Sequence, residues 1–194
     1  MIKAIIFDFG GVFSIIDDFQ EFWQKNGVKL GVDPEEAIEI FSPLWEKACV
    51  GQIDSNIILE KLGTFTKTDP KKLKGQLIEL SGFRDELYEY VKKNLKGKYK
   101  LAILSDHVEA WLELVLEEKK FREVFDVIVT SYNTGFVKPD IRIFEKVLKD
   151  LDVKAEECIF VEDMQENLVV AKNLGMNIIE FKNYNQFVKD FDNF

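Results

Sequence analysis

Short apolar runs alternate with helical patterns over much of this chain, and this alternation limits the possible folds more than any other feature. The run Ile2–Phe7 is β-branched and aromatic and ends at an acid and two glycines, as a buried strand does. Four similar runs follow, at 99–104, 124–129, 158–161 and 177–181. From residue 99 onward, helical patterns separate them. Apolar strands that alternate with helices predict an α/β fold, a doubly wound parallel sheet covered on both faces.

Residues 14 to about 96 interrupt this alternation, because the next clear strand after the first begins near residue 99. The pairs Asp33-Pro34 and Asp69-Pro70 are helix-start signals within this interval. Ser42-Pro43 predicts that another helix begins there. We therefore expect a small α-helical domain over residues 15–81, inserted after the first strand. Residues 1–14 and 82–194 would form the α/β catalytic core.

Composition excludes several classes of function. The net charge of −9 disfavours nucleic-acid or anionic-membrane surfaces, since both partners need clustered positive charge. No apolar run approaches 18 residues, and an acid follows the first strand too soon for a signal peptide. Two cysteines and one histidine are too few for iron–sulfur or structural zinc sites. We expect a cytoplasmic protein that binds neither nucleic acid nor membrane, of unknown oligomeric state.

Polar residues gather where the predicted strands end. Ligands of doubly wound sheets bind beyond the carboxyl ends of the strands, so the residues after each strand are the candidate site. They are Asp8, Gly10 and Gly11 after the first strand, Ser105, Asp106 and His107 after the second, Lys138 after the third, and Glu162 and Asp163 after the fourth.

This set suits chemistry at a phosphate. A carboxylate can attack phosphorus when the phosphate charge is neutralised and the nucleophile is oriented. Lys138 would neutralise a phosphate oxygen and tether Asp8, while Ser105 and nearby backbone N–H groups would bind the other oxygens. Mg²⁺ prefers oxygen ligands, and Asp8 with the Glu162/Asp163 pair could hold it. Glycines at 10 and 11 allow the backbone to approach the phosphate.

The four segments resemble the motifs of the haloacid dehalogenase (HAD) superfamily, in the same order: Asp8–Val12, Ser105, Lys138–Asp140 and Glu162-Asp163. The helical insertion resembles the C1 cap of that superfamily, and the likeness covers essentially the whole chain. The resemblance implies a flavodoxin-type core and an Asp8 nucleophile that forms an aspartyl-phosphate. It implies catalytic roles for Ser105 and Lys138, a phosphate site at Gly10, Gly11, Ser105, Asp106 and Lys138, and Mg²⁺ ligands at Asp8, the Gly10 carbonyl, Asp163 and Glu162.

Gly10 departs from the pattern, because phosphatases of this superfamily usually carry a second Asp there as general acid/base. Such help is worth roughly 10²–10⁴-fold in rate. The enzyme would then favour substrates with acidic leaving groups, or use Asp17, Asp18 or His107 as substitute acid/base, or not turn over. The opening also resembles those of sugar-phosphate phosphatases and of the phosphatase domains of epoxide hydrolases, which keeps activity plausible.

We therefore expect an Mg²⁺-dependent phosphatase acting on a small phosphorylated metabolite, with a sugar phosphate as one candidate. A 2-haloacid dehalogenase is an alternative, since its nucleophile attacks carbon and needs no Asp at position 10. Residues 13–45 lack an Arg for a halide site, however, and the Glu162-Asp163 pair favours a metal. A catalytically silent HAD-fold binding protein is the other alternative.

Overall fold

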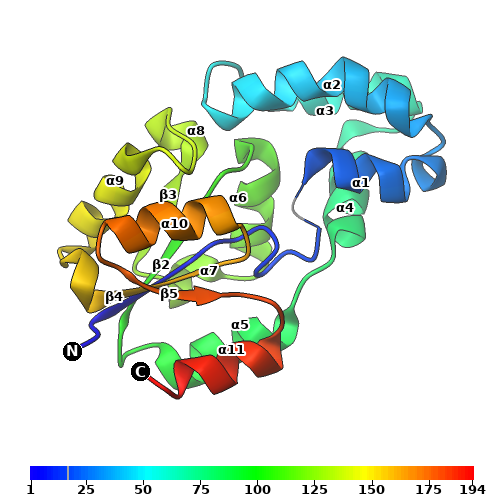
Figure 1. Cartoon of the computed structure of the whole chain (residues 1–194). Helices are drawn as coiled ribbons and strands as arrows, with labels where there is room; N and C mark the ends of the chain where they lie inside the picture. Colours follow the sequence, from blue (N-terminus) through cyan, green and yellow to red (C-terminus); the bar gives the residue numbers. More distant parts are fainter. Residues whose placement is uncertain (17) are drawn as a thin grey trace.

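A five-stranded parallel sheet forms the centre of the computed structural model, which describes residues 1–16 and 18–194 (Figure 1). The strand order is β3-β2-β1-β4-β5, so β1 lies in the middle of the sheet. Phe7 of β1 pairs with Ile103 on one side and Val161 on the other. The predicted parallel α/β sheet is confirmed. The strands are β1 (Ala4–Phe7), β2 (Lys100–Ser105), β3 (Val127–Thr130), β4 (Cys158–Glu162) and β5 (Asn177–Glu180).

Both faces of the sheet are covered because successive side chains of a strand point to opposite sides. Ile5 and Phe7 enter one apolar cluster, while Ala4 and Ile6 enter the other. The first face packs on α5 (Asp85–Tyr90), the π-helical turn η2 (Val91–Leu95), α6 (Glu109–Glu118), α7 (Phe121–Val124) and α11 (Tyr184–Phe191). The second packs on α9 (Ile141–Leu151) and α10 (Gln165–Asn173). Shorter turns are η1 (Val28–Leu30), α8 (Ser131–Thr134) and η3 (Ala155–Glu157).

Five α-helices lie between β1 and β2 in the described part of the chain, and the first four lie to one side of the sheet (Figure 1). These four are α1 (Phe19–Asn26), α2 (Pro34–Cys49), α3 (Asn56–Thr66) and α4 (Pro70–Ser81), and we call them the four-helix segment. Their apolar faces form a cluster of their own around the fully buried Trp23, Phe41 and Leu62. Trp111 of α6 joins this cluster from the sheet side. The division into a core (1–14 and 82–194) and a cap (15–81) stays a prediction.

The two connections to the four-helix segment run side by side. Ser14 and Phe83 form an antiparallel bridge, and the Ile16 N–H donates to the Ser81 carbonyl at 3.0 Å. Arg84 Nη1 lies 2.7 Å from the carbonyl oxygen of Gly11 and 2.6 Å from that of Ser14. The guanidinium of Arg84 therefore ties the loop after β1 to the chain that returns from the four-helix segment.

Two sequence expectations about element boundaries are wrong. No helix begins at Ser42, because α2 runs through Pro43 without a break. Pro43 is exposed, and the buried face of α2, which includes Phe41 and Ala48, holds the helix together around it. The strand expected from Val124 begins at Val127, since Val124 ends the short helix α7 and packs into the core from there.

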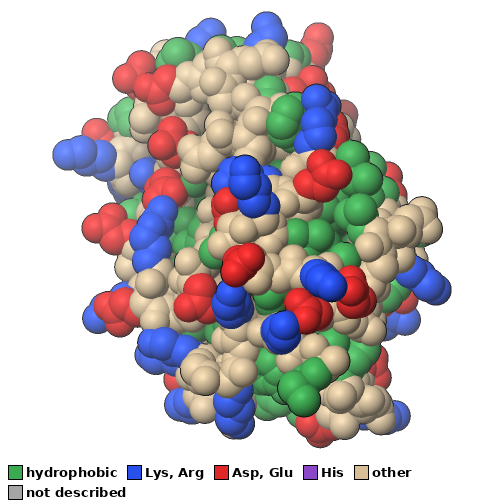
Figure 2. Space-filling view, turned by 90° about the vertical axis from the view of Figure 1, so that its left-hand side faces the viewer, with side chains coloured by type: hydrophobic (Ala, Val, Ile, Leu, Met, Phe, Trp, Pro, Cys, Tyr) green, Lys and Arg blue, Asp and Glu red, His purple; other side chains and the backbone are tan. Residues whose placement is uncertain are grey.

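The surface carries both signs of charge. On the face in Figure 2, acidic and basic side chains alternate with small apolar patches rather than gathering by sign. Among the described residues, no helix combines the length and apolar character needed to cross a membrane.

Candidate active site

The ends of the three central strands bring the predicted site residues together. Asp8 follows β1, and its N–H donates to the Val161 carbonyl of β4 at 2.9 Å. Ser105 is the last residue of β2 and Glu162 the last of β4. All three are buried, because β1 lies between β2 and β4 in the middle of the sheet. Parallel pairing thus places residues from distant parts of the chain at one edge.

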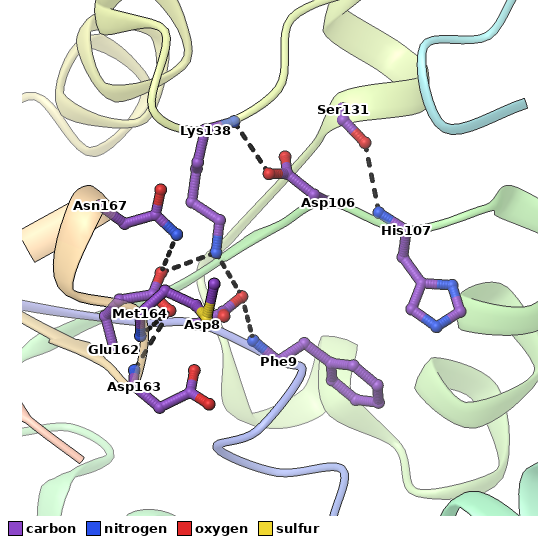
Figure 3. A network of polar contacts seen from close by, with 10 residues as sticks. All are labelled: Asp8, Phe9, Asp106, His107, Ser131, Lys138, Glu162, Asp163, Met164 and Asn167. Atoms are coloured by element: carbon purple, nitrogen blue, oxygen red, sulfur yellow. Dashed lines mark hydrogen bonds and ion pairs between the residues drawn. The ribbon is translucent and has the colours of Figure 1, made fainter. Parts of the chain in front are cut away.

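Lys138 joins two of these carboxylates. Its ammonium lies 2.6 Å from Asp8 Oδ1 and 2.8 Å from Glu162 Oε2, and all three side chains are at least 95% buried (Figure 3). Burial alone would lower the pKa of Lys138, but the charges of Asp8 and Glu162 outweigh it and raise that pKa above its ordinary value. Lys138 is therefore a permanent cation beside Asp8.

Glu162 orients this cation. Its Oε2 accepts hydrogen bonds from Lys138 Nζ and from Asn167 Nδ2, the latter at 3.0 Å. Its Oε1 accepts from the backbone N–H groups of Asp163 and Met164. Burial would raise the pKa of Glu162, but the charge of Lys138 holds it below the ordinary value. With both oxygens engaged, this carboxylate is suited to holding Lys138 in place.

The residues present fit a divalent cation. Oxygens of Asp8, Glu162 and Asp163 lie within 4.8 Å of one another, and the ammonium of Lys138 offsets one of the three charges. Gly11 has a φ of +61°, and a Cβ there would lie 2.0 Å from Asp163 Oδ2. A side chain at position 11 would therefore displace the Asp163 carboxylate, which explains the glycine. Asp8 and Asp163 would hold the ion, while Glu162 binds Lys138 and keeps it in place.

A cavity of about 130 Å³ opens beside this cluster. Asp8, Asp106, Lys138, Met164, Glu166 and Asn167 line it. Asp106 Oδ2 accepts the backbone N–H of Lys138 at 2.9 Å, so this carboxylate anchors the lysine loop to the end of β2. Gly10 and Gly11 lie in the turn that follows Asp8, where the Gly10 carbonyl accepts the Val12 N–H at 2.5 Å. The predicted phosphate-binding residues are thus neighbours, although their roles stay predictions.

Of the three proposed substitutes for the missing acid/base, the structure describes Asp18 and His107. The ring of His107 points away from Lys138 towards Phe9 (Figure 3), and burial lowers its pKa to about 4, so it is uncharged at neutral pH. Asp18 caps α1, where its Oδ1 accepts the Glu21 N–H at 2.8 Å. Asp17 lies outside the described residues. A neutral imidazole suits the acid part of this role poorly, and the substitute acid/base stays a prediction.

Sequence reasoning did not assign site roles to Arg84 or Asn167. Arg84 lies 70 or more residues from the carbonyls it binds, so no local pattern shows the contact. The sequence does contain a signal for Asn167, because it lies in the first turn of the helix that follows the Glu162-Asp163 pair. A side chain in that turn can reach back to Glu162.

A comparison with known families decides the broader identity. Residues 5–181 match the model of the haloacid dehalogenase-like hydrolases. This chain belongs to that family. The hydrolase also shares its fold with a HAD family enzyme of Bacteroides thetaiotaomicron crystallised with magnesium, at a TM-score of 0.80, 21% identity and 98% coverage of both chains.

The relatives of this hydrolase include phosphatases. A D-ribitol-5-phosphate phosphatase of Bacteroides thetaiotaomicron is 27% identical over 94% of this chain and 93% of its own length. The pyrophosphatase PpaX of Bacillus cereus is 32% identical over 123 residues. That match spans 58% of this chain and only 57% of the length of PpaX.

Proposed function

We propose that this hydrolase is an Mg²⁺-dependent phosphatase of small phosphorylated metabolites, with Asp8 as nucleophile. The observation that carries the proposal is the buried ammonium of Lys138, held 2.6 Å from Asp8 Oδ1 and 2.8 Å from Glu162 Oε2. A cation in that place offsets the negative charge of a phosphate oxygen and so lowers the repulsion between the phosphate and the Asp8 carboxylate. A relative that matches 94% of this chain is a phosphatase, which supports the same class of activity.

Each side chain has a distinct part in the proposed reaction. The Phe9 N–H and Lys138 both bind Asp8 Oδ1 and so fix the orientation of the carboxylate. An Asp8 oxygen attacks phosphorus, and the ester oxygen leaves with the bonding electron pair and takes a proton from water. Water then attacks the phosphorus of the aspartyl-phosphate and returns the carboxylate. Mg²⁺, when bound, neutralises phosphate charge and aligns the phosphate with Asp8.

The finer assignments are part of the same proposal. The four-helix segment would act as a cap that opens for substrate and excludes water on closing. Sugar phosphates are one candidate class, as the name of the ribitol-phosphate relative suggests. The three-carboxylate cluster suits a metal cation better than a halide, which disfavours the dehalogenase alternative. A cytoplasmic location and the absence of nucleic-acid and membrane partners stay predictions.

Hydrolysis of p-nitrophenyl phosphate with and without Mg²⁺ tests the function. Its leaving group is acidic, so the missing acid at position 10 matters least. We expect Mg²⁺-dependent turnover in the native chain and a loss of at least 10³-fold in Asp8→Asn, because the amide oxygen is a poor nucleophile. A folded native chain without turnover would refute the phosphatase, and a halide-release assay would then test the dehalogenase.

A further inference from the structure

An aromatic pocket lies between the four-helix segment and the nucleophile. Two small cavities, of about 40 and 20 Å³, share His107, Trp111 and Ser81 in their walls, so they are neighbouring parts of one space. Seven rings line the two cavities, and we call this set the aromatic pocket: Phe9, Phe19, Phe22, Trp45, Phe83, His107 and Trp111.

The rings of the pocket come from both sides of the interface. Trp45 of α2 lies 5.4 Å from the ring of His107 and 5.3 Å from that of Trp111, measured between centroids. Phe9 lies 6.1 Å from His107 and is the residue after Asp8 (Figure 3). The pocket therefore begins one residue from the nucleophile and extends to the four-helix segment.

The charged residues that line the cavities, Asp18, Glu118 and Lys119, are exposed or half-buried, whereas the inner polar groups already have partners in the protein. The hydroxyl of Ser14 donates to the Ile16 carbonyl at 2.7 Å, and that of Ser81 donates to the Leu77 carbonyl at 2.8 Å. His107 Nδ1 accepts the Val108 N–H at 2.9 Å. A ligand with many hydroxyl groups would find few unengaged partners among the inner groups, and each buried hydroxyl left without a partner would weaken binding.

The reaction geometry directs the leaving group to this pocket. In-line displacement puts the leaving oxygen opposite the attacking Asp8 carboxylate. Asp8 follows β1, and the four-helix segment closes over that end of the sheet through the contact of Trp45 with His107. Whatever alcohol is attached to the phosphate therefore meets the rings. Cavities of this size can hold water, but ring walls offer water little, so an apolar group displaces it favourably.

We propose that the aromatic pocket binds the alcohol part of the substrate, and that this alcohol is apolar and flat rather than a polyol. The inference rests on the proposed phosphatase function. Rings pack on such a group edge-to-face, as Trp45, His107 and Trp111 now pack on one another, and the four-helix segment moves to admit it.

Three alkyl and acyl phosphates test this inference. Benzyl phosphate and D-ribitol 5-phosphate both release primary alcohols, so they differ mainly in what the pocket must bind. Acetyl phosphate is too small to reach the rings and reports the phosphatase reaction itself. We expect kcat/KM to be at least tenfold higher for benzyl phosphate than for ribitol 5-phosphate.

A pair of variants links that preference to the pocket. Trp45→Ala should lower the ratio of kcat/KM for benzyl phosphate to that for acetyl phosphate by about tenfold. Phe65→Ala is the matched control, since Phe65 is also a half-buried ring of the four-helix segment but packs on Phe41 away from the pocket. It should leave the ratio unchanged.

The outcomes separate this inference from the function on which it rests. Acetyl phosphate turnover with a preference for ribitol 5-phosphate would overturn the apolar pocket and leave the phosphatase standing. Equal effects of the two variants on the ratio would also overturn it. No turnover of acetyl phosphate by the folded native chain would refute the phosphatase and the pocket together.

Discussion

The ring of His107 lies among Phe9, Trp45 and Trp111, where an imidazolium would lose most of its hydration. Burial accordingly lowers its pKa from 6.5 to about 4, against a weaker opposing effect of the Val108 carbonyl. The imidazole of His107 is therefore an uncharged aromatic ring at neutral pH. The same shift makes stability depend on pH.

Between pH 6.5 and about 4 the unfolded chain binds a proton at His107 that the folded chain does not. The free energy of unfolding should therefore fall as pH falls, by about 1.4 kcal/mol per pH unit and roughly 3 kcal/mol in total from this group. His107→Asn keeps an acceptor for the Val108 N–H but cannot titrate. Urea unfolding of both proteins from pH 4 to 7.5 should give a difference that grows as pH falls, and parallel curves would contradict the assigned burial.

At the scale of elements, the loop after β1 depends on a residue from the other end of the four-helix segment. Arg84 Nη1 lies 2.6, 2.7 and 3.1 Å from the carbonyl oxygens of Ser14, Gly11 and Val12. This loop carries Gly11, on which the Asp163 carboxylate rests. Arg84 is thus a positioning residue that acts on the site through the backbone.

Arg84→Met keeps most of the apolar stem and removes the donors. We expect the free energy of unfolding to fall by about 2–4 kcal/mol, since hydrogen bonds from a charged donor contribute about 1.5–3 kcal/mol each and are not additive. Arg122→Met is the control, because Arg122 is exposed and pairs with Glu113, and such surface pairs contribute at most about 1 kcal/mol. Equal losses in urea unfolding would show that the carbonyl contacts of Arg84 matter no more than a surface ion pair.

Helix α2 contains a proline that its packing tolerates at a cost. Pro43 has no N–H for the helix, and an interior proline costs about 3 kcal/mol relative to alanine. Pro43→Ala should raise the free energy of unfolding by about 2 kcal/mol, after allowance for the greater freedom of the unfolded chain. Thermal unfolding would check this, with Pro70→Ala as control, because Pro70 is at the first position of α4 and has no helical bond to restore. A lower midpoint for Pro43→Ala would contradict this account.

At the scale of the whole molecule, three carboxylates at one edge of the sheet lie beside the ammonium of Lys138, and the charge of Arg84 also acts on one of them, Asp163. Their mutual repulsion opposes folding, and a bound divalent cation relieves it. Because the unfolded chain has no assembled site, binding adds to the free energy of unfolding. Folding and metal binding should therefore be coupled.

Mg²⁺ at 100 times its Kd should raise the free energy of unfolding by about 2.7 kcal/mol over that in EDTA. Asp163→Asn should remove most of this increase, because it replaces a charged ligand. Asp192→Asn, at an exposed carboxylate after α11, should keep it. An equal increase in both variants would place the ion elsewhere, and this measurement needs no substrate.

The sequence by itself determined the sheet and most of the candidate site. Asp8, Ser105 and Glu162 could be found because each follows or ends an apolar run, and parallel strands bring such positions to one edge. Local sequence was sufficient to find these positions, since a few consecutive apolar residues predict a buried strand. Pro43 shows the limit of local signals, because a proline begins the helices α2 and α4 at Pro34 and Pro70, whereas α2 continues through Pro43.

Only the tertiary structure decided which oxygens meet which donors. The contact of Lys138 with Glu162, of Arg84 with the Gly11 carbonyl and of Trp45 with His107 each joins separate segments of the chain. Nothing in the neighbouring residues encodes such pairs, because they depend on how whole elements pack. Burial makes His107 neutral, whereas the charges of Asp8 and Glu162 keep Lys138 protonated in spite of its burial, and both environments exist only once the chain has folded.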